Sequence, residues 1–281
     1  MRPINHLVLA GHDLKALRAL YADLGFPLTP RSQHPFGTGN TVIQLRGAYL
    51  ELLAVTAPSD VVEHTAATFS FSAFNRDYLA RHEGFSMLVM DGRDAAADIA
   101  AWRVAGLKTY APFDFSRTAR LPSGEDVTVG FSLAFTSTPE APWLGHFACQ
   151  HLRRDYFEQP QYLRHANTAW GVDEVWIVSE PADVLEKHLA TFLDGHAERD
   201  GRRLVFATHS GRIVLSDARD FTEVFGEPPP HPQDGPHLAA VTIGCRTLDV
   251  LETAGLSRVG ERLVLPSARA FGTVLAFRTV A

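Results

Sequence analysis

The chain has 281 residues, of which 46% are hydrophobic and 21% charged, and its formal net charge is −6 at pH 7. This length allows one large domain or two of about 140 residues. The negative charge gives no electrostatic basis for binding nucleic acid, and no stretch approaches the roughly 20 apolar residues of a membrane span. We therefore expect neither a nucleic-acid partner nor a membrane partner.

The first predicted unit consists of a strand, a helix and a pair of strands, at residues 4–10, 14–24, 41–45 and 49–55. Asp13 is placed to cap the helix, and Gly25 ends it. The first strand is mostly apolar and carries one ionisable residue, His6, and the last strand is apolar except for Glu51. Because a charge inside an apolar strand is costly to bury alone, these two residues are expected to face each other or a shared ligand.

Three further units follow the same order. The second is predicted at 85–90, 94–105, 107–112, 127–136 and 146–152, the third at 174–178, 182–193, 203–208 and 212–217, and the fourth at 238–245, 247–254, 259–265 and 272–279. Residues 58–81 and 153–170 show neither a strand nor a helix pattern, and the latter stretch is the predicted domain boundary. The sequence thus predicts an α+β fold of four βαβββ modules, paired in two domains at 1–155 and 170–281.

The two cysteines, Cys149 and Cys245, lie in apolar, strand-like surroundings, which favours buried thiols. The N-terminus runs directly into a predicted strand, so we expect no signal peptide. Both features predict a cytoplasmic protein.

Several short motifs resemble the vicinal oxygen chelate superfamily, and within it the glyoxalase-like proteins of the glyoxalase/bleomycin resistance/extradiol dioxygenase fold. They are the early strand with His6, the loop His34-Pro35 followed by Gly37, Thr38 and Asn40, and the strand Tyr49-Leu50-Glu51-Leu52. Two later stretches, 147–152 and 164–167, resemble the same group. The resemblance covers most of residues 4–180.

The resemblance implies paired modules whose curved sheets surround a cavity. In the metal-using members, the first and fourth strands supply the ligands, and these positions match His6 and Glu51. In the second module the first-strand position falls at Ser86 or Met87, and neither is a usual ligand. This incomplete set argues against a glyoxalase I-type activity, which relies on a full octahedral metal site.

His6 and Glu51 are predicted ligands of a divalent metal, which would be Fe, Mn, Zn, Ni or Co. His151 is the third predicted ligand, because two His and one carboxylate form the facial triad of non-haem Fe(II) oxygenases. His34 or a water are further candidates for the remaining position. A direct salt bridge between His6 and Glu51 without a metal stays open as the alternative.

Glu51 and His34 are the predicted catalytic residues, with His34 as a general base or substrate contact, unless it is only a turn residue of its Gly-rich loop. The predicted substrate-binding residues combine polar and aromatic side chains: Asn40, Tyr49, Phe147, Cys149, His165 and Arg117. Arg117 would hold a substrate carboxylate if it does not simply lie at a solvated strand edge. An apolar pocket with these few polar groups suits a small organic ligand.

The C-terminal modules contain no His-His-Glu set of the kind that two-domain extradiol dioxygenases of this superfamily carry there, so we expect this half to be structural. Three functions remain open. The first is a metal-dependent lyase, isomerase or dioxygenase acting on a small organic molecule, and the second is a metal-free protein that binds or sequesters small molecules. The third is a scaffold that acts by dimerisation, and the sequence allows either a monomer or a homodimer.

Overall fold

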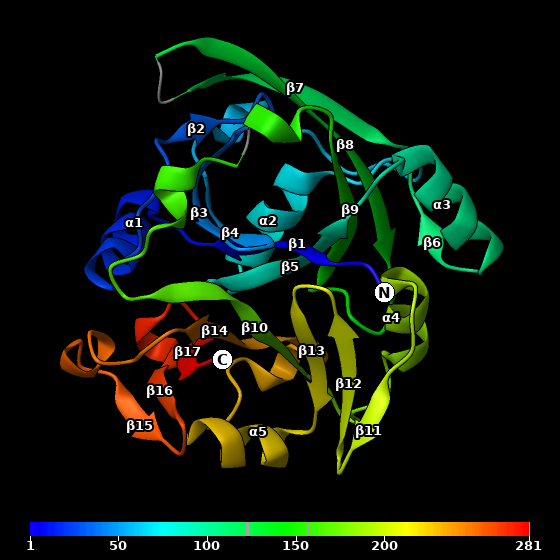
Figure 1. Ribbon diagram of the computed structural model, residues 1–281. Helices are drawn as coiled ribbons and strands as arrows, with labels where there is room; N and C mark the ends of the chain where they lie inside the picture. Colours follow the sequence, from blue (N-terminus) through cyan, green and yellow to red (C-terminus); the bar gives the residue numbers. More distant parts are fainter. Residues whose placement is uncertain (122–123, 157, 281) are drawn as a thin grey trace.

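The strands of the protein form two sheets, and the order of strands in one sheet repeats in the other (Figure 1). The computed structural model describes residues 1–121, 124–156 and 158–280, and within these ranges one sheet has nine strands and the other eight.

The first sheet runs in the order β2-β3-β4-β1-β5-β9-β8-β6, and β7 pairs with β8 off this path. Its strands are β1 (Ile4–Ala10), β2 (Ser32–Gln33), β3 (Thr38–Leu45), β4 (Ala48–Val55), β5 (Gly84–Asp91), β6 (Lys108–Thr109), β7 (Phe113–Arg120), β8 (Asp126–Ser137) and β9 (Gly145–His151). β1 runs parallel to β4, and β5 runs parallel to β9. The two modules join where β1 and β5 pair antiparallel.

The second sheet repeats this plan in the order β11-β12-β13-β10-β14-β17-β16-β15. Its strands are β10 (Ala169–Val178), β11 (Glu198–Asp200), β12 (Arg203–Thr208), β13 (Gly211–Ser216), β14 (His237–Cys245), β15 (Ser257–Val259), β16 (Arg262–Leu265) and β17 (Val274–Thr279). β10 and β14 are the first strands of their modules, and they also pair antiparallel. The prediction of an α+β fold with four modules in two pairs is confirmed.

One hydrophobic core lies between the two sheets. It is built from the outer faces of the strands of both sheets together with three helices, α1 (Leu14–Asp23), α3 (Ala95–Val104) and α4 (Glu186–Leu193). As predicted, Asp13 caps α1, where its carboxylate accepts hydrogen bonds from the backbone N–H groups of Lys15 and Ala16. Because this core contains residues from both halves, neither sheet is covered by its own half of the chain alone.

Two more helices occupy the inner, concave sides of the sheets: α2 (Phe71–Leu79) and α5 (Ala218–Phe225). Each connects the last strand of one module to the first strand of the next. The expectation that residues 58–81 are irregular was wrong, because α2 lies in this stretch. Ser70 caps the helix by accepting a hydrogen bond from the backbone N–H of Ala73.

Three other predicted elements need correction. The helix expected at 247–254 is only a 3₁₀ turn at Leu251–Thr253. Leu248 and Leu251 are buried in this segment, and a single turn is enough to bury both side chains. The helix expected at 182–193 begins at Glu186. The strand expected at 107–112 is reduced to β6, and the longer β7 follows it.

The inner side of the second sheet is filled. Trp176 packs edge-on against Phe225 of α5, and both side chains are buried. Glu174, also buried, accepts hydrogen bonds from Trp176 Nε1 at 2.9 Å, from Arg262 at 2.8 Å and from Arg212. The parallel pair β10 and β13 corresponds to the parallel pair β1 and β4 of the first sheet. Glu174 lies opposite Arg212 in the one pair, as His6 lies opposite Tyr49 in the other. A carboxylate with arginine partners therefore occupies the place in the second sheet that His6 occupies in the first.

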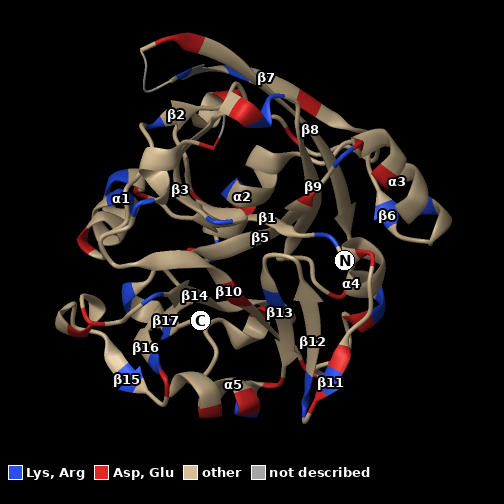
Figure 2. Cartoon of the chain, viewed as in Figure 1, with Lys and Arg blue, Asp and Glu red and all other residues tan. Residues whose placement is uncertain are grey.

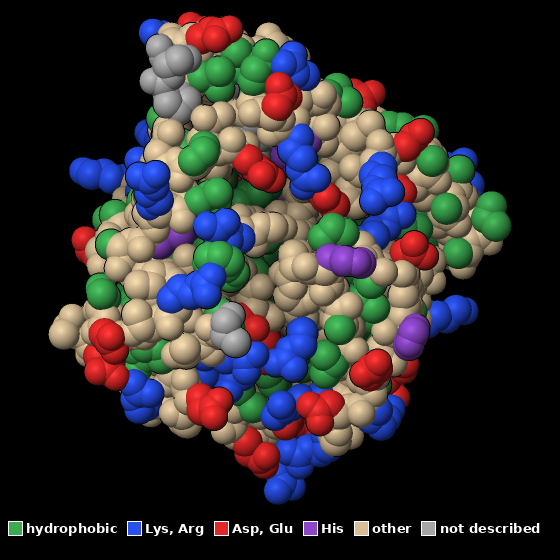
Figure 3. Space-filling model, in the orientation of Figure 1, with side chains coloured by type: hydrophobic (Ala, Val, Ile, Leu, Met, Phe, Trp, Pro, Cys, Tyr) green, Lys and Arg blue, Asp and Glu red, His purple; other side chains and the backbone are tan. Residues whose placement is uncertain are grey.

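Charged residues of both signs are distributed over both halves of the chain (Figure 2). On the face drawn in Figure 3, basic and acidic side chains are intermixed and neither sign forms a continuous patch. Among the described residues, no helix has the length and apolar character needed to cross a bilayer.

The shared core predicts that the two halves unfold together. Phe192 of α4 is fully buried, and its ring centre lies 5.4 Å from that of Trp102 in α3. Phe192→Ala is expected to lower the free energy of unfolding by about 3–5 kcal/mol, because it leaves a cavity where the halves meet. Urea unfolding should stay a single transition, coincident by tryptophan fluorescence and by far-ultraviolet circular dichroism.

The control is Val104→Ala, a change at a residue that is 91% exposed and should cost less than about 0.5 kcal/mol. Two separate transitions in the Phe192→Ala variant, with only one displaced, would show that the halves are independent.

Candidate functional site

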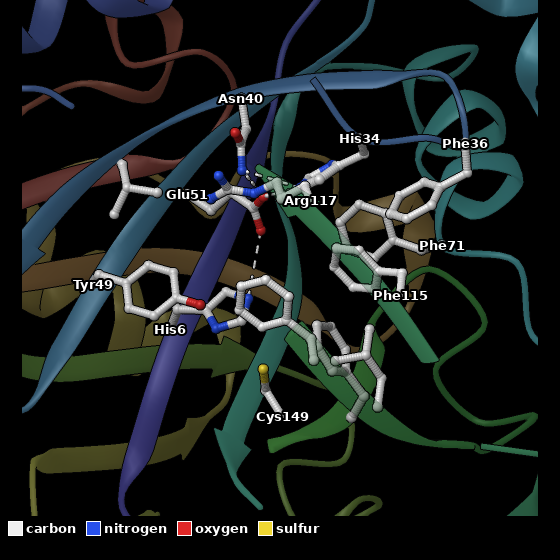
Figure 4. Close-up of a pocket in the computed structure, with 14 residues that line it drawn as sticks. His6, His34, Phe36, Asn40, Tyr49, Glu51, Phe71, Phe115, Arg117 and Cys149 are labelled. Carbon is white, nitrogen blue, oxygen red and sulfur yellow. Dashed lines mark hydrogen bonds and ion pairs between the residues drawn. The ribbon is translucent and has the colours of Figure 1, made fainter. Parts of the chain in front are cut away.

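The inner side of the first sheet surrounds a small cavity of about 40 Å³ (Figure 4). Its wall contains most of the predicted site residues and a group of phenylalanines: His6, His34, Phe36, Asn40, Val42, Tyr49, Glu51, Phe71, Phe115, Arg117, Phe131, Leu133, Phe147 and Cys149. Small-molecule sites in proteins are typically lined, as this one is, by mostly apolar side chains with a few polar groups.

His6 and Glu51 lie on neighbouring parallel strands. His6 of β1 pairs with Tyr49 of β4, and Val8 pairs with Glu51, so His6 and Glu51 are one step apart on the inner face. His6 Nε2 lies 3.5 Å from Glu51 Oε2, and both residues are buried. The Tyr49 ring stacks on the His6 imidazole with 4.3 Å between ring centres, which fixes the plane of the imidazole.

A chain of hydrogen bonds determines which nitrogen of His6 carries the proton. The amide nitrogen of Asn5 donates to Asp91, a carboxylate that also accepts two hydrogen bonds from Arg154. The amide oxygen of Asn5 therefore faces His6, and it accepts a hydrogen bond from His6 Nδ1 at 2.7 Å. A neutral His6 then presents the lone pair of Nε2 to Glu51.

Asn40 and His34 complete the surroundings of Glu51. The amide nitrogen of Asn40 donates to Glu51 Oε1 and lies 3.3 Å from His34 Nε2. His34 Nδ1 hydrogen-bonds to Thr38 Oγ1 at 2.8 Å. With the amide nitrogen of Asn40 facing it, His34 Nε2 is the acceptor and directs its lone pair toward the Asn40 N–H.

The protonation states follow from burial and from these contacts. Burial lowers the pKa of His6, and it lowers the pKa of His34 to about 4, so both rings are neutral at pH 7. Burial alone would raise the pKa of Glu51. At the low pH where this carboxyl titrates, a proton held between His6 Nε2 and the carboxylate, the positive charge of a protonated His34 and the Asn40 hydrogen bond outweigh it and lower this pKa to about 2. At neutral pH the site therefore consists of an ionised carboxylate and two neutral imidazoles.

This donor set is chemically suited to a cation. An imidazole lone pair and a carboxylate oxygen that face each other without a proton between them gain by binding a positive charge. Two ligands that share one metal at about 2.1 Å lie roughly 3.0–3.5 Å apart, close to the 3.5 Å between His6 Nε2 and Glu51 Oε2. The described residues contain no group of three or more His, Cys, Asp or Glu arranged as an ion site, so His6 and Glu51 are a set of two.

The structure places His151 and His165 outside the cavity wall. His151 lies behind His6, where its Nε2 is 3.4 Å from the same Asn5 oxygen that accepts the His6 hydrogen bond. His165 packs edge-on against Phe26, with 5.5 Å between ring centres. The predicted third ligand thus supports His6 from behind, and the predicted substrate contact of His165 has no place in this cavity.

Two elements that contribute residues to the cavity wall, α2 and β7, were not among the helices and strands predicted from the sequence. Phe71 belongs to α2, in the stretch expected to be irregular. Arg117 belongs to β7, where Phe113, Phe115 and Arg117 alternate with more exposed residues. This alternation, Phe-Asp-Phe-Ser-Arg-Thr, is a strand signal that was readable in the sequence.

Cys149 lines the cavity as a neutral thiol. Burial raises its pKa well above the usual range for a cysteine. A thiol held in this state is a poor nucleophile at neutral pH, so Cys149 contributes to the wall and not to nucleophilic chemistry.

Solved structures similar to this chain share its fold at low sequence identity. A hypothetical protein from Staphylococcus aureus matches over 100% of both chains, with a TM-score of 0.72 and 12% identity. A mutant of 4-hydroxymandelate synthase from Streptomyces coelicolor matches over 95% of this chain and 78% of its own, with a TM-score of 0.55 and 12% identity. A fusion of a xylose isomerase-like TIM barrel with 4-hydroxyphenylpyruvate dioxygenase matches over 99% of this chain and 49% of its own, with a TM-score of 0.58 and 11% identity.

No curated protein matches the sequence. A family model described as a glyoxalase-like domain matches residues 4–193, a range that includes the whole first sheet and its cavity. This range is more than half of the chain. The chain therefore belongs to the family of glyoxalase-like domain proteins.

Proposed function

We propose that the protein is a metal-dependent enzyme of the vicinal oxygen chelate type that acts on a small organic molecule in the cavity of the first sheet. The observation that carries this proposal is the contact between His6 Nε2 and the ionised Glu51. Their lone pairs face each other in an apolar cavity, at a separation that accepts a cation.

His6 and Glu51 would hold the metal. A divalent ion there, from the set Fe, Mn, Zn, Ni and Co, would polarise two adjacent oxygen atoms of a substrate, which is the chemistry shared by the lyases, isomerases and dioxygenases of this type. Because the described chain offers two ligands, several coordination positions remain for the substrate and for water.

The other residues have distinct roles in this proposal. His34 is neutral at pH 7 and lies beside Glu51, so it is available to take a proton from a bound substrate. Asn40 fixes the Glu51 carboxylate through its hydrogen bond to Oε1. The phenylalanine rings of the wall exclude water, which strengthens each polar contact inside the cavity.

The names of the structural neighbours are consistent with an enzyme but do not carry the proposal. Two of them are named as a synthase and as a fusion with a dioxygenase. At 11–12% identity this likeness concerns the fold. A fold hosts many functions, so the argument for this chain rests on Glu51 and its neighbours.

The metal prediction is tested by elemental analysis of protein purified without a chelating tag, followed by titration with each candidate ion. We expect about one ion per chain in the wild type and at least a tenfold loss of affinity in Glu51→Gln and in His6→Ala, because each change removes one of two ligands. His12→Ala, at an exposed position, is the matched control and should bind like the wild type. A wild type that takes up none of these ions would refute the proposal.

The hydrogen-bond chain behind His6 gives a second prediction. Asn5→Ala removes the acceptor that holds the Nδ1 proton, so the ring loses its fixed tautomer. Changes of this kind cost about 10- to 100-fold in metal affinity, and we expect a loss in that range by isothermal titration calorimetry. A measurement with unchanged affinity would mean that His6 is not a ligand, or that its orientation is set by Tyr49 alone.

The neutral state of His34 predicts how stability depends on pH. Its pKa is about 4 in the folded protein, below the usual 6.5. Below about pH 6.5 the unfolded chain takes up this proton while the folded chain does not, so stability falls as the pH is lowered from 6.5 to 4. Without metal, the free energy of unfolding of the wild type should therefore fall more over this range than that of His34→Gln, by up to about 3 kcal/mol.

This pH prediction is measured by urea unfolding at fixed pH values with a chelator present. The control variant is His12→Gln, which should follow the wild-type curve. Parallel curves for His34→Gln and the wild type would show that His34 is not held neutral, and its role as a base would lose its support.

A further inference from the structure

A second, larger hollow lies outside the cavity and meets it at Arg117. This hollow has a volume of about 480 Å³ and is lined by residues 29–33, by β7 and β8, and by Tyr156, Gln159 and Tyr162. It shares Val42 and Arg117 with the inner cavity. These two side chains therefore lie at the boundary, or neck, between the outer hollow and the inner cavity.

Arg117 has no counter-ion at the neck. Its guanidinium forms no ion pair with a carboxylate of the described residues, and its buried Nε has no hydrogen-bond partner there. The guanidinium packs over the Phe131 ring, 6.0 Å from the ring centre, on the cavity side of β7. A partly buried cation with unused donors is costly unless a ligand supplies the missing acceptor.

The charges that face Arg117 leave room for an anion. Glu51 is the nearest acidic group of the inner cavity; it lies beyond ion-pair distance and is already bonded by Asn40. In the outer hollow, Arg31 and Arg120 add positive charge, and the one acidic residue among the lining residues, Asp126, pairs with Arg120 at 3.5 Å. The outer hollow thus carries three arginines against one aspartate.

We propose that Arg117 binds the carboxylate of the substrate, and that the substrate is a small organic acid with an aromatic or similarly apolar group. The apolar group lies in the inner cavity against Phe36, Phe71 and Phe115, and the carboxylate stays at the neck. The planar guanidinium presents paired N–H donors that match a carboxylate in shape and charge. This inference rests on the proposed function, because it names the substrate class of the same cavity.

The ring contacts of the inner cavity support the apolar part of this substrate. Phe36 lies edge-on to Phe71 and to Phe115, with 5.8 and 5.1 Å between ring centres. His34 stacks on Phe36 at 4.9 Å, so this aromatic cluster begins directly beside the proposed base. A flat apolar group placed among these rings brings its neighbouring atoms close to His34 and Glu51.

The test compares an acid with its neutral amide of the same shape. Phenylacetate and phenylacetamide are titrated calorimetrically into metal-free protein with a chelator present, so that no metal–carboxylate contact contributes. We expect the wild type to bind phenylacetate at least tenfold more tightly than phenylacetamide. Arg117→Gln should weaken phenylacetate by about 10- to 100-fold and change phenylacetamide less than threefold, since only the charge-assisted hydrogen bonds are lost.

Two further variants serve as controls. Arg219→Gln removes a positive charge from an exposed position of α5, far along the chain from this hollow, and should change the affinity for either probe less than threefold. Arg117→Lys keeps the charge without the paired donors and should retain part of the preference for the acid.

The inference is overturned if the wild type binds neither probe, or binds both equally. It is also overturned if Arg117→Gln keeps the acid preference, or if Arg117→Lys and Arg117→Gln weaken acid and amide alike. Failure of the proposed metal function gives a different result. A protein that takes up no metal but still prefers the acid through Arg117 would refute the metal function and support the binding of a carboxylate by Arg117.

Discussion

The contact between the His6 imidazole and the Glu51 carboxylate is the constraint to which the first half of the molecule is adapted. A buried carboxylate is stable only if its surroundings supply hydrogen bonds or positive charge. Asn40 supplies one hydrogen bond, and the chain from Arg154 through Asp91 and Asn5 holds the imidazole in a fixed tautomer. The strand pairing of β1 with β4 brings the two groups together, and the aromatic wall keeps water away from them.

In the second half, the inner face of the same strand plan is packed with side chains. At the position that corresponds to His6, Glu174 is bound by Arg212 and Arg262, so its charge is satisfied within the protein. The helix α5 places Phe221 and Phe225 against the inner face of this sheet, where they complete a hydrophobic cluster with Trp176. In the first half, α2 lies in the equivalent connection, but it contributes Phe71 to a wall and leaves the space beside Glu51 open. One pair of modules thus carries the site, and the other contributes its outer face to the common core.

The common core also bears on how the site is held in place. The helices α1, α3 and α4 pack between the two sheets, so the outer faces of β1, β4 and β5 are buried against the second half. Side chains in such close-packed interiors occupy single rotamers and transmit little motion. The inner faces of the same strands carry His6 and Glu51, and their separation is therefore fixed by packing on both sides of the sheet.

The sequence alone determined the order of strands and helices in the modules, because apolar strand segments and helices that end at a glycine can be recognised from neighbouring residues. It also singled out His6 and Glu51, because ionisable groups within apolar strands stand out locally. His34 and Asn40 were identified by the loop motif that resembles the glyoxalase-like proteins. Other features depend on contacts between distant segments. The tertiary structure alone decided that His151 stands behind His6, that α2 and α5 occupy the two inner faces, and that one core joins both sheets. It also decided that Arg117 faces a cavity with no carboxylate partner among the described residues, because a strand pattern cannot show which charges lie across from it.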